Sequence, residues 1–554
     1  MAEKVWLGQY PEGVPEHINL DEYASVKELI ETNCAKYRDM AAYSCMGKTM
    51  TYAEIDEASE RFAAYLQQTA GLNKGDRVAV MMPNVLQYPV AVFGILRAGM
   101  VVVNTNPLYT ARELEHQLTD SGAKAIVILE NFACTLEKVI AKTDVSTVIV
   151  TNVGDMLGFP KGGITNFVVR RVKKMIPAWN IQDTISFKRA LHEGKWQKLE
   201  PVEVTHDDIA FLQYTGGTTG VAKGAILSHR NMVANMLQSM AWLSPVIRPG
   251  QEVVITALPL YHIFSLTANC LTFLAMGGHN VLITNPRDFD GFVAELRRYP
   301  WTSMTGVNTL FNALINTPGF SSLDFSKVVL TLGGGMAVQR NVAEDWQRVT
   351  NAPLIEAYGL TETSPAAAIN PLDNTDFNGS IGLPISSTEF SIRDDDGNAM
   401  AQGEIGEICI RGPQVMEGYW QRQEETDKVM LEGGWLRTGD VGRMDEKGFF
   451  YIEDRKKDMI LVSGFNVYPN EIEDVVAGHD GILEAAAVGI PNEKSGEVVK
   501  VFAVKKDGGV TEQDVIAHCK ENLTAYKVPK SVEFRDELPK TNVGKILRRE
   551  LRDS

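Results

Sequence analysis

The chain has 554 residues, too many for a single core, and we expect a large enzyme built from several parts. Its composition, 44% hydrophobic and 22% charged, is typical of a soluble globular protein, and its net charge of −16 argues against a nucleic-acid-binding protein. Six scattered cysteines without a C-x-x-C pair favour reduced cytoplasmic thiols over a disulfide framework or a zinc site. We expect no signal peptide, and the longest apolar run, Leu266–Met276, is shorter than the ~20 residues that cross a bilayer.

The first part of the chain alternates between helical and strand-like patterns. From Ser25 to Gln68, apolar residues at helical spacing predict two helices around one short strand. The next expected elements are strands at Val78–Met82, Met100–Asn104 and Ala125–Leu129, a helix ending near Leu96 and a helix over Ala111–Asp120. Continuous apolar strands that alternate with helices predict a parallel sheet covered on both faces.

A basic segment interrupts this pattern in an otherwise acidic chain. Between Phe167 and Trp179, apolar residues stand beside a cluster of four basic side chains, Arg170, Arg171, Lys173 and Lys174. Such a segment is typical of an amphipathic helix that lies on an anionic membrane surface. It is also typical of a solvated surface helix, which is the more common origin of a charge run, and the pattern alone leaves both interpretations open.

A loop rich in glycine and threonine, Tyr214–Ala225, follows the apolar run Ile209–Tyr214 and is the strongest local signal in the chain. Its residues are Tyr214, Thr215, Gly216, Gly217, Thr218, Thr219, Gly220, Val221, Ala222, Lys223, Gly224 and Ala225. Glycines let backbone N–H groups converge on an anion, hydroxyls add donors, and lysine adds charge. The loop is not a Walker A motif, because Lys223 does not follow a glycine and precede serine or threonine. We predict that it binds phosphate; the alternative is a flexible turn.

The elements after the loop predict a helix, a β-rich region and a separate C-terminal unit. Ser228 is expected to cap a helix that ends near Met240 and carries methionines at positions 232, 236 and 240. From Gly379 to Glu453, short strands and glycine turns predict a small β subdomain. We predict a large unit over residues 1–453, a charged hinge over 454–458 and a C-terminal unit over 459–554.

Four further stretches have the character of ligand-binding loops. They are Gly333-Gly334-Gly335-Met336, Tyr358-Gly359-Leu360-Thr361-Glu362-Thr363, Trp435-Leu436-Arg437-Thr438-Gly439-Asp440 and Lys540-Thr541-Asn542-Val543-Gly544-Lys545-Ile546. Each alone is weak, since turns or core packing explain any one of them. Together they supply an aromatic face for a base, carboxylates for a ribose and for Mg²⁺, and lysines for phosphates, so we predict an ATP site.

On these motifs the whole chain resembles the adenylate-forming superfamily, which includes acyl-CoA synthetases, firefly luciferase and the adenylation domains of peptide synthetases. Within it, the chain is most similar to bacterial long-chain fatty-acid–CoA ligases, on residues 213–225, 259–264, 454–473 and 538–552. The expected fold is α/β, with αβαβα layered sheets and a β subdomain in the large unit and a small α+β C-terminal unit on a hinge. The expected activity has two steps: ATP and a carboxylate give an acyl-adenylate and pyrophosphate, and coenzyme A then displaces AMP.

The resemblance also assigns roles to individual residues. Thr215 and Glu362 are implied to hold Mg²⁺, and Lys545 to bridge the fatty carboxylate and the α-phosphate. The loop Tyr214–Ala225 is implied to bind the phosphates. The ring of Tyr358 is implied to stack on adenine beside Gly333, Gly334 and Gly335, with Gly359 and Thr361 next to it. Asp440 and Arg455 are implied to contact the ribose. The C-terminal unit is implied to rotate about Lys457 and to present Ser463 and Gly464 to coenzyme A.

The expected substrate is a long-chain fatty acid. The peptide synthetases carry an aspartate where this chain has Tyr261-His262-Ile263-Phe264, which argues against an amino acid. His262 is expected either beside the reacting carboxyl group or as a core histidine bonded to a backbone carbonyl. Met232, Met236 and Val307 fit an acyl tunnel, although ordinary core packing explains the methionines equally well.

Three alternatives to this function stay open. They are a ligase for a medium-chain or aryl acid, an acyl-AMP ligase that serves a carrier protein, and a fatty-acid-binding or transport protein gated by ATP. The resemblance implies a homodimer, and with the basic segment it implies a cytoplasmic protein peripherally associated with the inner membrane.

Overall fold

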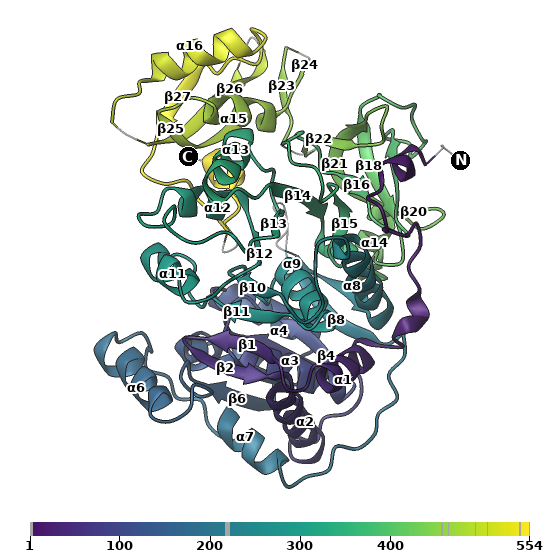
Figure 1. The fold of residues 1–554 in the computed structure, drawn as a ribbon, viewed down its shortest axis with the longest axis vertical. Helices are drawn as coiled ribbons and strands as arrows, with labels where there is room; N and C mark the ends of the chain where they lie inside the picture. Colours follow the sequence, from purple (N-terminus) through teal and green to yellow (C-terminus); the bar gives the residue numbers. More distant parts are fainter. Residues whose placement is uncertain are drawn as a thin grey trace.

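The computed structural model describes residues 4–215, 222–455, 458–463, 465–492, 495–506, 508–541 and 544–552. Two large sheets dominate it, and a β subdomain and a small α/β unit stand at one end of the molecule (Figure 1). The chain is therefore α/β, as the sequence predicted.

The first large sheet has nine strands and is parallel at its centre. Its strands, in spatial order, are β16 (Leu383–Pro384), β15 (Ala366–Ile369), β14 (Leu354–Gly359), β13 (Leu330–Gly333), β12 (Ser303–Gly306), β10 (Val253–Thr256), β11 (His279–Leu282), β1 (Ala41–Cys45) and β2 (Lys48–Thr51). The second has eight strands: β19 (Gly418–Tyr419), β9 (Lys223–Ser228), β8 (Ile209–Thr215), β4 (Val101–Asn104), β3 (Arg77–Met81), β5 (Ala125–Leu129), β6 (Thr147–Thr151) and β7 (Ile185–Ser186).

Alternating side chains along the strands sort the large unit into layers. On β3, Val78 and Val80 join the core between the two sheets, whereas Ala79 and Met81 join a core on the opposite face of the same sheet. The same division occurs on β10 of the other sheet. Each sheet is thus covered on both faces, and the αβαβα layering predicted for the large unit is confirmed.

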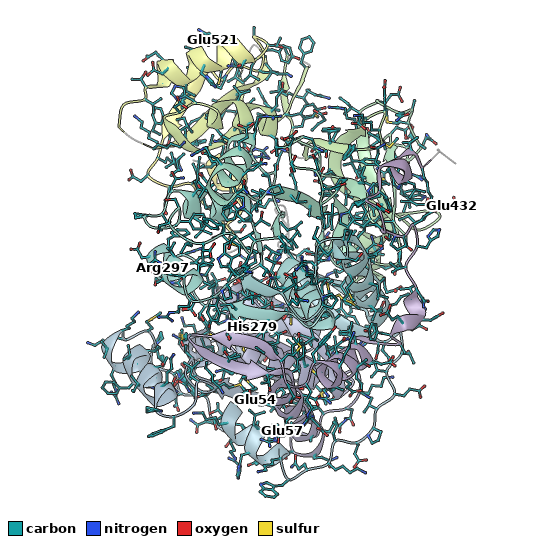
Figure 2. The ribbon with its side chains drawn as sticks, in the orientation of Figure 1. Glu54, Glu57, His279, Arg297, Glu432 and Glu521 are labelled. Carbon is teal, nitrogen blue, oxygen red and sulfur yellow. The ribbon has the colours of Figure 1, made fainter. Side chains whose placement is uncertain are left out.

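The helices of the large unit supply these covering layers. The central layer holds α1 (Val26–Lys36), α2 (Tyr52–Gln68), α3 (Gln87–Arg97) and α8 (His229–Leu243). The outer layers hold α4 (Ala111–Ser121) and α5 (Ala133–Glu137) on the eight-stranded sheet, and α11 (Phe289–Leu296), α12 (Asn308–Ile315) and α13 (Arg340–Thr350) on the nine-stranded sheet. Charged side chains such as Glu54 and Arg297 are exposed, whereas His279 lies within the body (Figure 2).

The remaining helices are short or peripheral. They are α6 (Lys161–Phe167), α7 (Phe187–Gly194), α9 (Ile263–Ser265), α10 (Phe273–Ala275) and α14 (Gln423–Val429), with π-turns at Val168–Val172 and Leu266–Thr272 and 3₁₀ turns at Val5–Gln9, Leu20–Glu22, Glu130–Phe132, Ile140–Lys142 and Thr361–Thr363. The run at Leu266 is therefore a buried helical segment. Among the described residues, no helix is long and apolar enough to cross a membrane.

The predicted β subdomain is a five-stranded antiparallel sheet. Its strands are β17 (Glu389–Arg393), β18 (Gly406–Arg411), β21 (Trp435–Met444), β20 (Met430–Leu431) and β22 (Phe450–Arg455). The C-terminal residues form another sheet from β24 (Phe465–Val467), β23 (Ile460–Val462), β26 (Gly496–Lys505), β25 (Ile482–Asn492) and β27 (Ser531–Phe534), with helices α15 (Pro469–Ala477), α16 (Glu512–Asn522) and α17 (Arg548–Arg552).

The C-terminal sheet has apolar clusters of its own, built around residues such as Ile472, Val501 and Phe502. It touches the large unit through polar contacts: Asn312 Nδ2 donates to the Leu483 carbonyl at 3.0 Å, and Asn341 Nδ2 to the Ala477 carbonyl at 3.0 Å. The exact boundaries at 453, 454–458 and 459 stay a prediction.

Candidate active site

The glycine–threonine loop connects two neighbouring antiparallel strands. Thr215 ends β8 opposite Lys223, which begins β9, so the two strands form a hairpin beside the edge strand β19. The Tyr214 hydroxyl donates to Asp120 Oδ2 at 2.8 Å, and burial, followed by this hydrogen bond, raises the pKa of Tyr214. A Cβ at Gly224 would lie 3.1 Å from the Tyr214 ring, so a larger residue there would press against that ring. The six predicted phosphate contacts from Gly216 to Val221 lie outside the described residues.

The described ends of the loop are well anchored. The Ala222 carbonyl accepts from His116 Nε2 at 2.8 Å, and the Gly224 carbonyl accepts from the Trp420 N–H at 2.8 Å. Ala225 is buried and pairs with Tyr419 on the short edge strand β19. Two fixed strands therefore set the position from which the loop departs and returns.

The predicted adenine and ribose residues lie together. Tyr358 ends in a hydroxyl that donates to Asp440 Oδ2 at 2.6 Å, although the two residues are 82 positions apart. Asp440 lies opposite Arg455 in the register of β21 and β22, and only 2% of Asp440 is exposed. The β subdomain thus brings its carboxylate to the carboxyl end of β14, where Tyr358 lies.

Glycines keep the backbone open around this strand end. Gly335 has a φ of +76°, which favours glycine, and a Cβ at Gly334 would lie 3.0 Å from the Ala357 carbonyl. A Cβ at Gly359 would lie 1.9 Å from the Pro365 carbonyl, so no other residue fits without a shift of the backbone. Gly333 ends β13, the strand beside β14, so the predicted glycine segment and Tyr358 stand on adjacent strands.

Glu362 and Thr361 occupy a 3₁₀ turn directly after this strand. Glu362 Oε1 accepts from the Tyr419 hydroxyl at 2.7 Å, and the turn packs against β8 and β9. Thr215, the other predicted Mg²⁺ residue, directs its hydroxyl toward the Lys223 carbonyl at 3.5 Å. Among the described residues, no group of three or more His, Cys, Asp or Glu side chains forms a metal-binding cluster.

A cavity of about 320 Å³ lies beside this turn. Its lining residues come from the 3₁₀ turn, β18 to β21 and α14, namely Leu360, Glu362, Glu407, Tyr419, Lys428, Val429, Leu436, Arg437, Thr438 and Gly439. It contains the predicted metal carboxylate and the two residues before Asp440.

Lys545 approaches the large unit from the C-terminal unit. Its N–H donates to Thr541 Oγ1 at 3.0 Å, and the preceding Gly544, with a φ of +85°, offers its carbonyl to Thr309 Oγ1 at 3.1 Å. Burial, together with the charge of Lys545, lowers the pKa of His262 to about 4. These residues are 283 positions apart in the sequence, and the fold brings the charge of Lys545 near enough to affect the pKa of His262.

His262 is held in one orientation. Its Nδ1 accepts a hydrogen bond from the Phe264 N–H at 3.3 Å, so the neutral ring carries its proton on Nε2. Both interpretations of His262, a place beside the reacting carboxyl group and a core histidine bonded to a backbone carbonyl, stay predictions.

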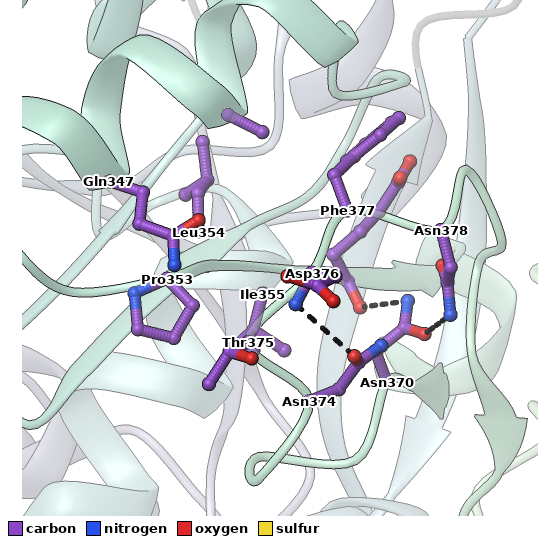
Figure 3. A pocket seen from close by; sticks show the side chains of 12 residues that line it. Gln347, Pro353, Leu354, Ile355, Asn370, Asn374, Thr375, Asp376, Phe377 and Asn378 are labelled. Atoms are coloured by element: carbon purple, nitrogen blue, oxygen red, sulfur yellow. Dashed lines mark hydrogen bonds between the residues drawn. The ribbon is translucent and has the colours of Figure 1, made fainter.

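A second pocket is lined by residues of α13, β14 and the segment that follows β15 (Figure 3). Asn370 Nδ2 donates to the Glu356 carbonyl at 3.3 Å, and Asn378 Nδ2 donates to Asn370 Oδ1 at 3.0 Å. The Glu356 side chain accepts from the Val338 N–H at 3.2 Å, and burial raises the pKa of Glu356 to about 8. A neutral carboxyl group therefore supports the strand that carries Tyr358.

The three predicted acyl-pocket residues do not lie together. Met232 and Met236 are fully buried on α8, in the core between the sheets. Val307 lies in the outer core of the nine-stranded sheet. It is a neighbour of both Gly335 and Gly544: a Cβ added to these glycines would lie 3.7 Å and 3.2 Å from its methyl groups. Val307 thus stands near Lys545, whereas the methionines pack as ordinary core residues do.

The predicted hinge and coenzyme A residues are only partly described. Arg455 ends β22, and Ser463 has a φ of +52° and donates its N–H to the Ser495 carbonyl at 2.7 Å. Lys457 and Gly464 lie outside the described residues. The roles of all four stay predictions.

Sequence reasoning missed Tyr419 and Glu425. Tyr419 bonds Glu362, and Glu425 of α14 forms an ion pair with Lys223. These pairs join positions 57 and 202 residues apart, and no spacing rule connects them. Only the fold reveals that they belong to the site.

Models of known protein families match most of the chain. The AMP-binding enzyme family matches residues 30–420, and the AMP-binding enzyme C-terminal domain matches residues 471–545. The chain belongs to the AMP-binding enzyme family, and the resemblance drawn from its motifs is confirmed.

Individual relatives narrow this assignment. The chain is 60% identical to the long-chain-fatty-acid–CoA ligase of Salmonella typhimurium, over 100% of this chain and 98% of the relative. It is 52% identical to the protein of the same name from Haemophilus influenzae, again over 100% and 98%. A solved anthranilate–CoA ligase in complex with anthranoyl-AMP superposes with a TM-score of 0.85 over 97% of this chain and 98% of that one. Its identity of 24% shows a common fold alone.

Proposed function

We propose that this chain is an AMP-forming long-chain fatty-acid–CoA ligase. It joins a fatty acid to the α-phosphate of ATP, releasing pyrophosphate, and then transfers the acyl group from the adenylate to the thiol of coenzyme A, releasing AMP. Support comes from full-length relatives that carry this name at 60% and 52% identity. The structural observation that carries the proposal is the contact of the turn before Lys545 with the large unit, where the Gly544 carbonyl accepts a hydrogen bond from Thr309 Oγ1 at 3.1 Å.

The first step needs fixed positive charge, because a carboxylate must approach a phosphate. Lys545 is proposed to lie between these two anions and to stabilise the charge that develops between them. A neutral His262 suits this place, since a second cation would raise the cost of burying the lysine. His262 Nε2–H is then a donor for a carboxylate oxygen.

Nucleotide binding is proposed to rest on the strand ends around Tyr358. The Tyr358 ring offers a face to the base, and Asp440 offers acceptor oxygens to the two ribose hydroxyls, while Tyr358 keeps that carboxylate in position. Thr215 and Lys223 stand at the ends of the loop that is proposed to hold the β- and γ-phosphates.

The donor set around Glu362 fits Mg²⁺. One carboxylate and one hydroxyl are hard oxygen ligands, and Mg²⁺ commonly takes one or two carboxylates together with substrate phosphates. Glu362 and Thr215 are proposed to hold the ion, which neutralises phosphate charge when bound. Tyr419 keeps Glu362 oriented in the meantime.

A direct test uses purified protein, ATP, Mg²⁺, coenzyme A and acids of graded chain length, with AMP and thioester measured together. We expect equal amounts of AMP and thioester, with the greatest rate for long chains. AMP without thioester would favour an acyl-AMP ligase that serves a carrier protein, and no AMP would favour a binding protein. A maximal rate with medium-chain or aryl acids would show that these are the substrates.

We also propose that the enzyme contacts an anionic membrane through residues 159–175. This segment, which includes α6, projects from the side of the large unit (Figure 1). Its exposed apolar residues are Phe159, Ile164, Phe167, Val172 and Met175. Such a surface beside exposed Arg171, Lys173 and Lys174 suits acyl chains and anionic headgroups together.

The structure sharpens the test of this contact. Arg170 pairs with buried Glu130, and Trp179 Nε1 donates to the same carboxylate at 3.3 Å, so both residues also anchor the segment. A charge reversal should therefore be confined to Arg171, Lys173 and Lys174. We expect this variant to lose sedimentation with vesicles that contain phosphatidylglycerol while keeping its thermal stability. Unchanged sedimentation would refute the contact. The homodimer also stays a prediction, which the molar mass measured by light scattering would test.

A further inference from the structure

The ion pair of Lys223 with Glu425 connects the glycine–threonine loop to α14. Lys223 begins β9 at the end of the loop, and its Nζ bonds Glu425 Oε2. The same Nζ lies 5.1 Å from the centre of the Tyr419 ring, an arrangement in which the ring face attracts the cation. The lysine therefore has a defined resting position, set by a carboxylate and an aromatic ring.

Glu425 contacts a second lysine at the same time. Lys428 Nζ bonds Glu425 Oε1, so the two carboxylate oxygens hold two separate ammonium groups. Lys428 lines the cavity of about 320 Å³ that also contains Glu362 and Tyr419. The two lysines lower the pKa of Glu425 to about 2, so the carboxylate is charged at all physiological pH values.

Two lysines that lie close together form an anion-binding site, and here the Glu425 carboxylate is the bound anion. A carboxylate that bridges two lysines uses ammonium groups of the kind that bind the oxygens of a polyphosphate. A phosphate group that reaches Lys223 competes with Glu425 for the charge of this ammonium group. We propose that Glu425 is a positioning residue that competes with the pyrophosphate part of ATP, and with released pyrophosphate, for Lys223 and Lys428.

The inference rests on the proposed function, because it takes Lys223 as a phosphate ligand. Its consequence is a weaker hold on pyrophosphate at the end of the first step, since Glu425 re-forms its contact as the product leaves. The pair is half-exposed, with 32% and 29% of the two side chains accessible, so water and salt moderate its strength.

The test compares Glu425→Gln with Glu424→Gln. Both variants remove one negative charge from the first turn of α14, but the described contacts of Lys223 and Lys428 involve Glu425. We expect Glu425→Gln to lower the inhibition constant of inorganic pyrophosphate and the KM for ATP by about threefold, the size of an exposed ion pair. Glu424→Gln should leave both near the native values. The KM for the fatty acid should be unchanged in both variants, and the difference should shrink in high salt.

Equal effects in the two variants, or no effect in Glu425→Gln, would overturn the inference, because long-range charge or no competition would then explain the data. Calorimetric binding of inorganic pyrophosphate to the same proteins gives a readout that does not depend on turnover. If native protein forms no acyl-adenylate, the proposed function fails. If it forms acyl-adenylate and the pyrophosphate affinities are equal, the competition alone fails.

Discussion

The two lysines of the proposed site, Lys223 and Lys545, belong to different units of the protein. Lys223 stands on β9 of the eight-stranded sheet and contacts Glu425 and Tyr419, which belong to the large unit as well. Lys545 stands in a glycine turn of the C-terminal unit, the preceding Gly544 bonds Thr309 of the large unit, and the charge of Lys545 contributes to the lowered pKa of His262. One lysine belongs to the large unit, and the other belongs to the C-terminal unit.

This difference suits the chemistry that we propose. Pyrophosphate has to be held during the first step and released at its end, so a lysine with an internal carboxylate partner is appropriate there. The α-phosphate has to be activated only in the first step, so a lysine on a separate unit can be withdrawn before coenzyme A enters. The comparison therefore predicts that the two steps depend on Lys545 to different degrees.

The largest expected effect follows from replacing Lys545 with alanine. We expect the rate of acyl-adenylate formation to fall by about 10²-fold or more, because a charge positioned for the transition state is lost. Thioester formation from supplied acyl-adenylate should stay within a few-fold of native. Lys540→Ala, in the same turn but paired with Glu484 at 2.6 Å, is the control. An equal loss in both steps would contradict a lysine that serves only the first.

A smaller effect is expected from the Tyr358–Asp440 pair. Asp440→Asn should raise the KM for ATP by about tenfold, since a buried carboxylate acceptor is replaced by a neutral amide. Tyr358→Phe should have a smaller effect, and the double variant should cost less than the sum of the two. Strict additivity in steady-state kinetics would show that the 2.6 Å hydrogen bond does not couple the two residues.

The buried carboxyl group of Glu356 should make the free energy of unfolding depend on pH. Its pKa is raised to about 8, whereas a glutamate in the unfolded chain titrates near about 4.3. Between these two pKa values Glu356 is protonated in the folded state and ionised in the unfolded state. The free energy of unfolding therefore decreases as pH rises from about 5 to 8. Glu356→Gln keeps an acceptor for the Val338 N–H and removes the titration. Relative to native, the variant should gain stability toward pH 8 in urea unfolding; parallel pH curves would contradict the shift.

The sequence predicted the regular parts of the fold well. The run Ala125–Leu129 is β5, because five buried apolar residues in a row suit a strand covered on both faces. Ser228 caps α8, as its hydroxyl and the downstream helical spacing indicated. The single strand expected between the first two helices is wrong: Met46 and Gly47 have φ values of 49° and 73°, which turn the chain into the hairpin of β1 and β2.

The site was predictable only in part, for a physical reason. Glycine-rich loops and isolated carboxylates mark strand ends, and so the motifs containing Tyr358, Asp440 and Lys545 are visible along the chain. Contacts such as Lys223 with Glu425 depend on how β9 and α14 pack, and no local pattern encodes them. The acyl pocket is the weakest part, because apolar residues that line a tunnel and those that fill a core follow the same periodicity.

The arrangement of the two units is tested most directly by the pKa of His262. Burial lowers it to about 4 with a smaller contribution from Lys545, whereas burial alone lowers the pKa of His279 to about 4. NMR titration of histidine-labelled protein should show the His262 pKa rising in Lys545→Ala, while the His279 pKa stays the same. A His262 pKa that does not move would mean that Lys545 is not beside it in solution, and the account of a delivered lysine would be contradicted.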